Sequence, residues 1–447
     1  MASAAEQLAA NMNFGAFQKA TELHKRIWFT LIAMLIYRVG TYIPIPGINI
    51  AAFAQAFEGQ SKGILGMFNM FSGGAVARMA IFSLNVMPYI SASIIVQLLG
   101  TAYPPWEKLR KEGGEAGRKQ LNQYTRYLTV ILALFQSFGI AVGLSNGQGI
   151  VDNPGLFFII STMITLTGGT IFLMWLGEQM TSRGIGNGIS LIIFAGIVAR
   201  LPIGLWDLLQ EARLDPSKTA LIFGYFGLAV AVILFIVFME RAQRRLLIVY
   251  PKRQVGNRMT GGENSFLPLK INVAGVIPPI FASSLLLLPA TALGFLTTAK
   301  LPPWAQWLPL FVGQLTHGKP LFMVLYGALI IFFCFFYTSV VFNPEDTAEN
   351  LRKYGGNLPG IRPGKRTAEY IDYVLTRLTL IGAIYIAIVC LVPEFLAGPS
   401  GSYAFGGTSI LIVVSVTMDT VAQIQSQLLA HQYEGLIKRS KLRGARR

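Results

Sequence analysis

The segment MPYISASIIVQLLG, residues 87–100, is apolar enough to cross a lipid bilayer, yet polar side chains interrupt it. A helix rotates by about 100° per residue, so Val86, Ile90, Ser93 and Gln97 share one face that is first aliphatic and then polar. An unpartnered amide in hydrocarbon costs several kcal/mol, so this face should avoid lipid. The sequence therefore predicts a membrane helix whose polar face either packs on other helices or lines water.

The whole chain has the composition of an integral membrane protein. Of its 447 residues, 53% are hydrophobic and 13% are charged, about half the charged share of a typical soluble domain. Runs of about 20 mainly apolar residues predict ten transmembrane helices. These cover residues 26–44, 76–99, 124–144, 156–177, 188–206, 219–240, 272–294, 321–343, 372–392 and 406–428. We therefore expect an all-α polytopic membrane protein.

Basic residues, which give a formal net charge of +16, gather in alternate loops of this arrangement. An even number of spans places both termini on the same side, and the loops on that side hold most of the lysines and arginines. The positive-inside rule predicts that both termini and these loops are cytoplasmic. Five spans precede the stretch WDLLQEARLDPSKT, and five follow it. This predicts two halves, 1–210 and 211–447, and an odd number of spans per half permits an inverted repeat.

Enzyme motifs are incomplete. The string GQLTHGKP, residues 313–320, fits the first seven places of a P-loop, but Pro320 stands where a magnesium-binding Ser or Thr is needed. The run GIGNGIS, residues 184–190, lacks the glycine spacing of a dinucleotide fingerprint and predicts a turn. The three histidines lie far apart in the sequence, at His24, His317 and His431. The sequence therefore predicts no metal, cofactor or catalytic triad.

Ion-coupled transporters usually need an ionisable side chain near mid-membrane, and few are present here. Arg377 lies near the start of the ninth expected span, Glu178 just past the end of the fourth, and Asp419 late in the last. We interpret all three as interfacial charges satisfied by snorkelling or by helix ends. Composition thus leaves two classes open, a channel and a secondary transporter of small solutes, with an intramembrane enzyme more remote.

Seven longer strings are more specific: MFNMFSGGAVAR, MPYISASIIVQLL, FLMWLGEQMTSRGIGNGISLIIFAGIVA, NVAGVIPPIFASS, FFCFFYTSVVFNPEDTAENL, PGIRPG and FGGTSILIVVSV. Together they resemble the bacterial SecY family, the pore subunits of the Sec protein translocase, from the first span to the C-terminal tail. The resemblance implies an hourglass channel in the cytoplasmic membrane, made of two inverted five-helix halves that open like a clamshell. Such a channel passes unfolded preproteins across the membrane and releases transmembrane helices sideways into lipid.

The resemblance also implies roles for individual residues. A ring of bulky aliphatic side chains at the waist of the pore would consist of Val86, Ile90, Ile189, Ile193, Ile280 and Ile412. A plug in the outer funnel would include Ile64, Leu65, Met67, Phe68, Asn69, Met70 and Phe71. A lateral gate, a seam that is sometimes wet, would include Ser93, Gln97, Gln136, Asn272 and Ser283.

Finally, the resemblance implies partners. A passive channel of this family works with the SecE and SecG subunits and takes its energy from the SecA motor ATPase or from the ribosome. Its substrates are signal sequences and preproteins, and its surroundings are membrane lipids. The docking surface for SecA and ribosomal RNA would include Arg241, Arg244, Arg245, Lys252, Arg253 and Arg362. The alternative is that these charges only set the topology and bind anionic lipid.

Overall fold

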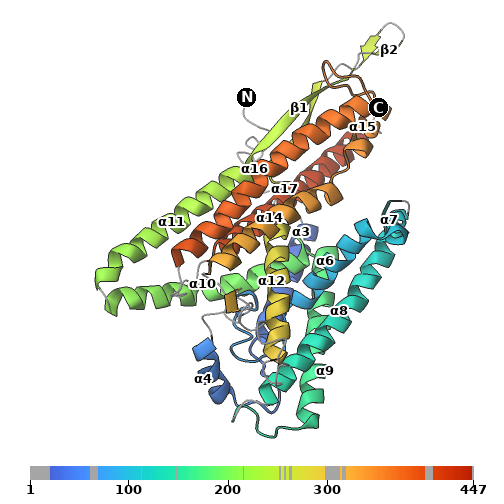
Figure 1. The fold of residues 1–447 in the computed structure, drawn as a ribbon. Coiled ribbons are helices and arrows are strands. Elements are labelled where there is room, and N and C mark those ends of the chain that lie inside the picture. The colour runs from blue at the N-terminus through green and yellow to red at the C-terminus, as the bar shows by residue number, and fades with distance from the viewer. Residues whose placement is uncertain are drawn as a thin grey trace. The chain divides into compact units, whose positions relative to one another are not determined.

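A computed structural model describes residues 21–60, 69–111, 113–145, 149–214, 216–250, 253–255, 258–260, 264–296, 313–314, 319–397 and 406–444. The described chain is mostly helical (Figure 1). It divides into two compact units. The first unit consists of Met1–Ser61, Leu65–Arg200 and Val416–Arg447, and the second of Lys62–Ile64 and Leu201–Ser415.

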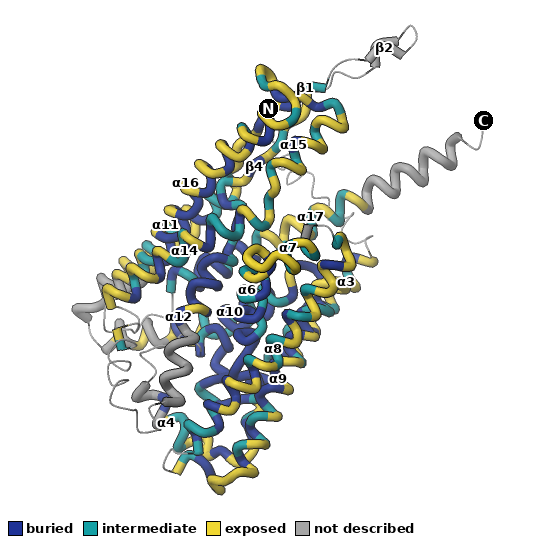
Figure 2. The backbone as a smooth tube through the Cα atoms, turned by 45° about the vertical axis from the view of Figure 1, so that its right-hand side comes forward, coloured by how far each residue is buried: buried dark blue, intermediate teal, exposed yellow. Residues whose placement is uncertain are grey.

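In the first unit, α8 packs against both α6 and α9. Its elements are α3 (Thr21–Gly40), α4 (Ile50–Gln60), α6 (Met87–Ala102), α7 (Pro104–Lys111), α8 (Gly114–Ser145), α9 (Leu156–Arg183), and parts of α10 (Gly188–Leu214) and α17 (Gly407–Gly444). A buried apolar cluster holds α8 and α9 to the preceding loops and comprises Ile45, Ile48, Met79, Leu84, Leu144, Val151, Phe158 and Leu166. Buried and exposed residues alternate along α8 and α9 so that each helix has a covered and an open face (Figure 2).

In the second unit, α14 packs against both α12 and α16. The elements are the rest of α10, α11 (Pro216–Arg241), β1 (Gln243–Val249), β2 (Arg253–Val255), β3 (Arg258–Thr260), β4 (Asn264–Lys270), α12 (Ile277–Leu296), α14 (Pro320–Val341), α15 (Pro344–Lys353), α16 (Lys365–Ala397) and the beginning of α17. The strands form two antiparallel pairs, β1 with β4 and β2 with β3. The register of the first pair runs from Gln243↔Lys270 to Val249↔Asn264.

A helix overlaps each of the ten expected spans. Among the described residues, six helices are long and apolar enough to cross a membrane: Gly114–Ser145, Leu156–Arg183, Gly188–Trp206, Pro320–Lys353, Lys365–Pro393 and Gly407–Ala430. Two shorter apolar helices, Met87–Ala102 and Ile277–Leu286, fall in the second and seventh expected spans. The predicted class, a mainly helical polytopic membrane protein, is confirmed. The count of ten crossings and the division at residue 210 stay predictions.

The expected span 76–99 is wrong at its beginning, because the helix starts only at Met87. The residues before it form turns, with positive φ at Gly74 (90°), Met79 (45°) and Asn85 (49°). A right-handed helix of L-residues requires negative φ, so these positions cannot belong to one. Proline lies in the first turn of α6, where a helix needs no backbone donor.

The turn predicted within GIGNGIS is confirmed between α9 and α10. Two neighbouring helices hold its backbone. Thr30 of α3 accepts a hydrogen bond from the Ile185 N–H through Oγ1 at 3.1 Å, and Gln423 of α17 accepts one from the Gly186 N–H through Oε1 at 2.8 Å. The beginning of α10 is therefore fixed to the rest of the first unit.

Candidate functional site

Four residues of the predicted pore ring lie in the first unit. Val86 directly precedes α6, and the N–H of Ile90 donates to its carbonyl at 3.0 Å. Ile189 and Ile193 lie one turn apart on α10. Val86, Ile90 and Ile193 are buried, and Ile189 is half-buried. Each pair presents branched aliphatic side chains one helical turn apart, as one face of a helix would.

The other two ring residues lie in the second unit. Ile280 belongs to the first turn of α12, and Ile412 lies in the second turn of α17. Both side chains are buried. The structure thus places each predicted ring residue in a helix or directly before one, and the closure of all six into one ring stays a prediction.

Three of the predicted plug residues are described, and they are tied to the start of α6. Asn69 and Phe71 are buried, and Met70 is half-buried. Asn69 accepts a hydrogen bond from the Ala77 N–H through Oδ1 at 2.9 Å, and Asn85 donates from Nδ2 to the Phe71 carbonyl at 2.7 Å. The remaining predicted plug residues lie outside the described residues: Ile64, Leu65, Met67 and Phe68.

Two arginines that the sequence did not mark as site residues gather beside this segment. Arg38 donates from Nη1 to the Gly73 carbonyl and from Nη2 to the Tyr42 hydroxyl, each at 2.8 Å. The guanidinium of Arg78 lies over the Tyr42 ring, 4.0 Å from its centroid. A cation over an aromatic face is stabilised by the ring quadrupole. A charge-assisted hydrogen bond from Arg38 therefore holds the glycine turn that follows the plug residues.

The predicted gate residues of the first unit lie on the two packed helices α6 and α8. Gln97 donates from Nε2 to the Ser93 hydroxyl at 3.1 Å. The side-chain oxygens Oε1 of Gln97 and of Gln136 are buried without a hydrogen-bond partner among the described residues. A buried carbonyl without a donor costs free energy. The place of Gln97 and Gln136 in a gate stays a prediction.

The predicted gate residues of the second unit are bonded locally. Ser283 donates to the Ile280 carbonyl on its own helix at 2.9 Å. Asn272 is buried and donates from Nδ2 to Glu240 Oε1 at 2.6 Å. Glu240, in the last turn of α11, was missed in the sequence, although a carboxylate inside an expected span was the signal that could have found it. Asn272 therefore serves the turn before α12, and its place in a gate stays a prediction.

The predicted docking residues that the structure describes all lie in the second unit. Arg241 ends α11, Arg244 and Arg245 lie on β1, and Arg362 lies between α15 and α16; all four are exposed. Arg253 begins β2, and Lys252 lies outside the described residues.

A backbone bridge joins the end of β1 to the segment between α15 and α16. Val249 and Asn357 exchange hydrogen bonds, N–H to carbonyl, at 2.9 and 3.0 Å. Below the bridge lies a buried apolar cluster that consists of Leu246, Leu269, Leu358, Ile371, Val374 and Leu378. The strands were missed in the sequence because QRRLLIV does not alternate clearly between polar and apolar residues. The bridge thus connects β1, which carries Arg244 and Arg245, to the segment between α15 and α16 that carries Arg362.

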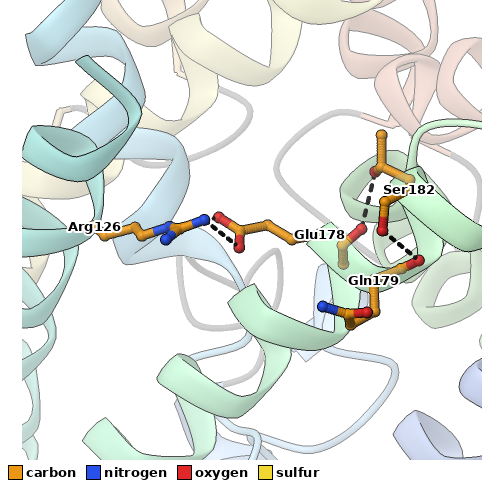
Figure 3. Close-up of polar contacts among 6 residues, drawn as sticks. Arg126, Glu178, Gln179 and Ser182 are labelled. Atoms are coloured by element: carbon orange, nitrogen blue, oxygen red, sulfur yellow. Dashed lines mark hydrogen bonds and ion pairs between the residues drawn. The ribbon is translucent and has the colours of Figure 1, made fainter. Parts of the chain in front are cut away.

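The interpretation of Glu178 is corrected by an ion pair. Glu178 lies inside α9, which continues to Arg183, and it faces Arg126 of α8 (Figure 3). Arg126 donates from Nε to Oε1 at 2.9 Å and from Nη2 to Oε2 at 2.8 Å. Both side chains are partly exposed, at 48% and 29%. A bidentate pair therefore joins α8 to α9.

The other two charges noted in the sequence differ from this pair. The Arg377 guanidinium lies over the Tyr373 ring on α16 at 4.3 Å, and Asp419 is exposed on α17. Among the residues that the structure describes, no three His, Cys, Asp or Glu side chains gather as a metal site would require. What the described sites offer is aliphatic surface, amide groups and exposed arginine, which suit contact with polypeptide and polyanions.

Comparisons with known proteins bear on the whole chain. A sequence model described as SecY matches residues 80–421. The protein translocase subunit SecY of Rickettsia bellii is 50% identical over 438 residues, which are 97% of this chain and 100% of that protein.

Two solved structures share the fold. One is described by the statement that the plug domain of the SecY protein stabilises the closed state of the translocation channel and maintains a membrane seal. It matches with a TM-score of 0.68 at 19% identity and covers 92% of this chain and 93% of that one. Sec61 in the canine ribosome-channel complex from the endoplasmic reticulum matches with a TM-score of 0.64 at 18% identity, covering 92% and 93%. Across so large a sequence distance, the helical arrangement itself is what is shared.

Proposed function

Because this chain belongs to the SecY family of protein translocase subunits, we propose that unfolded preproteins cross the membrane through a pore closed by its six aliphatic ring residues. The chain is a subunit of a protein-conducting channel and belongs to a family of channels rather than of enzymes. The observation that carries the function is the 50% identity over 97% of the chain. The alternative of a secondary transporter for small solutes is not supported by these comparisons.

The proposed ring seals by excluding water. Valine and isoleucine offer no ligand to an ion, and their branched side chains are stiff, so a narrow collar of them can dewet. A membrane potential drives each elementary charge with about 2.3 kcal/mol per 100 mV, so a wet waist would leak. The same side chains make no specific contact, which allows any peptide sequence to slide past them.

The proposed plug completes the seal. The structural neighbour whose description assigns a membrane seal to its plug domain supports this role. Here the described end of the plug segment is bonded to Asn85, the residue directly before ring residue Val86. Movement of the plug would therefore strain or break the Asn85–Phe71 hydrogen bond and act on the beginning of α6.

The proposed lateral gate sorts segments by partitioning alone. Ten leucines favour lipid by roughly 3–6 kcal/mol, and one arginine at mid-membrane opposes by about 3 kcal/mol. The buried, unpartnered amide oxygens of Gln97 and Gln136 support a seam on α6 and α8 that is at times wet. A signal sequence or transmembrane helix would leave through it into lipid.

The channel would be passive, with energy supplied by partners. We place SecE and SecG beside it, and SecA or the ribosome on two arginine-rich loops, the segment that follows α11 and carries Arg244 and Arg245, and the segment between α15 and α16 that carries Arg362. The exposed side chains of Arg244, Arg245 and Arg362 on one scaffold support a polyanionic or acidic partner. A ribosome-bound complex among the structural neighbours supports the ribosome as one such partner. The positive-inside rule supports a cytoplasmic membrane location with both termini in the cytoplasm.

The test is crosslinking of a stalled secretory chain to single cysteines. Cys334 and Cys390 are both buried, and replacing them with alanine leaves a background without thiols. Cysteines at Ile193 and Ile280 should crosslink to the stalled chain. A matched cysteine at Ile131, which lies on α8 with 61% of its surface exposed, should react with lipid probes instead. Labelling of the Ile131 position by the stalled chain, with none at the ring, would overturn the proposed route.

A further inference from the structure

Asn272 is bonded in a way that only an amide side chain allows. Its Nδ2 donates to Glu240 Oε1 at 2.6 Å and to the Gly275 carbonyl at 3.2 Å, while its Oδ1 accepts from the Gly275 N–H at 3.0 Å. Gly275 has a φ of 64°, which favours glycine. A carboxylate would lack the donor and a lysine would lack the acceptor. The side chain therefore locks the turn before α12 to the end of α11.

This turn is also the point where the hairpin of β1 and β4 reaches α12. Strand β4 ends at Lys270, and the next residue, Ile271, donates its N–H to the Ala242 carbonyl at 3.1 Å. Asn272 follows, and α12 begins at Ile277. Only six residues separate the strand from the helix, so a displacement of the hairpin base must either move the turn or break its bonds.

Helix α16 closes the turn from another side. A Cβ added at Gly382 would lie 2.7 Å from the Ile271 carbonyl oxygen and 3.6 Å from Asn272 Cα. Such a distance leaves no room for even one methyl group. The segment is therefore packed as well as hydrogen-bonded. Continuous contacts link the base of the hairpin, the turn and the beginning of α12.

We propose that Asn272 is a positioning residue that transmits partner docking on the arginine-rich loops to α12, the helix that carries Ile280 and Ser283. This inference rests on the docking role proposed above. The loop of Arg362 enters the same path, because Asn357 is bonded to Val249 of β1. A displacement of either loop on partner binding would therefore move the base of the β1–β4 hairpin and, through it, the Asn272–Glu240 hydrogen bond. In this assignment Asn272 acts through α12 and does not itself contact the exported chain.

The experiment exchanges donor and acceptor across the bond. Asn272→Asp removes the donor and sets two carboxyl groups against each other, whereas a second change, Glu240→Gln, supplies a new donor from the opposite side. Export is measured with the full complex in proteoliposomes at a saturating concentration of the SecA motor. The affinity of the motor for the channel is measured separately. We expect Asn272→Asp to slow export by about tenfold, the scale of one lost hydrogen bond to a carboxyl group. Affinity should stay within about twofold, and the double variant should recover most of the rate.

The matched control is Asn343→Asp. Asn343 also donates from Nδ2 to a carboxylate, Asp346 Oδ2 at 2.8 Å, but this bond is exposed and stays within the first turn of α15. It should leave export unchanged. Glu240→Ala gives a second, milder variant in case Asn272→Asp fails to fold, because it keeps both bonds of Asn272 to Gly275. Three results would overturn the proposal. These are normal export in both Asn272→Asp and Glu240→Ala, a loss of motor affinity that parallels the loss of export, and no recovery of export in the double variant Asn272→Asp, Glu240→Gln. If the parent channel itself shows no motor-dependent export, the proposed function fails and not this inference alone.

Discussion

Arg126 and Glu178 show at the scale of single residues how two membrane helices carry opposite charges. The guanidinium and the carboxylate meet through two parallel hydrogen bonds, which is the geometry that arginine favours with a carboxylate. The pair is partly exposed, so its contribution to stability is limited by solvent. Its value lies in fixing the register of α8 against α9.

Charge reversal tests this pair. Arg126→Glu should lower the melting temperature of the purified protein by roughly 2 °C or more, because it replaces attraction with repulsion between two carboxylates. Glu178→Arg should do the same from the other helix. The double reversal should restore most of the loss when thermal unfolding is followed by tryptophan fluorescence. A double variant as unstable as the sum of the single variants would show that the two side chains do not interact.

The ring residues are tested by removing their side chains. Replacement of Val86, Ile90, Ile193 and Ile280 by glycine should raise the ion conductance of the resting channel in a planar bilayer. The physical reason is that a wider, less apolar waist no longer excludes water. An unchanged resting conductance would count against the ring.

At the scale of elements, the segment before α6 is held by side-chain amides rather than by helix hydrogen bonds. Asn85→Gly keeps the backbone free to adopt a positive φ but removes the donor to the Phe71 carbonyl. We expect a raised resting conductance because the plug end is released. Asn49→Gly, on the loop before α4, removes a bond to the Ala52 N–H and serves as the control. Equal resting conductance in the two variants would show that the hydrogen bond from Asn85 does not contribute to the seal.

The arginine-rich loops are tested as one element. Arg362→Glu reverses an exposed charge in the loop between α15 and α16, and it should reduce motor-driven export and weaken binding most at low salt. Export assays across a salt series measure both effects. Export at the parental rate at every salt concentration would remove Arg362 from the docking surface.

The sequence predicted the helices better than the segments between them. Runs of apolar residues mark α8, α9, α14 and α16 because burial in lipid depends on composition and length. The start of α6 could not be predicted, since hydropathy does not report positive φ at Met79 and Asn85. The partner of Asn272 was equally hidden, because Glu240 lies 32 residues away in sequence. Contacts of that kind depend on tertiary packing.

At the scale of the whole molecule, the residues proposed for the gate come from both compact units, Ser93 from the first and Ser283 from the second. Single cysteines at Ser93 and Ser283 should each crosslink to a signal sequence trapped during export. The reason is that a helix leaving the pore must pass the polar seam before it reaches lipid. Mass spectrometry of the crosslinked peptides gives the attachment sites. Reaction of both cysteines with lipid probes alone would refute the gate.

The bridge between Val249 and Asn357 constrains how the lengths of the two bridged segments can evolve. Position 356 is tightly packed, because a Cβ there would lie 2.9 Å from Ile248 Cγ2 and 3.1 Å from Tyr250 Cε1, so a larger residue would have to displace these side chains. An insertion in one of the two bridged segments would shift the residues that pair with the other, so the lengths of the two segments depend on each other. Across species, lineages that change the length of one of them should carry a compensating change in the other.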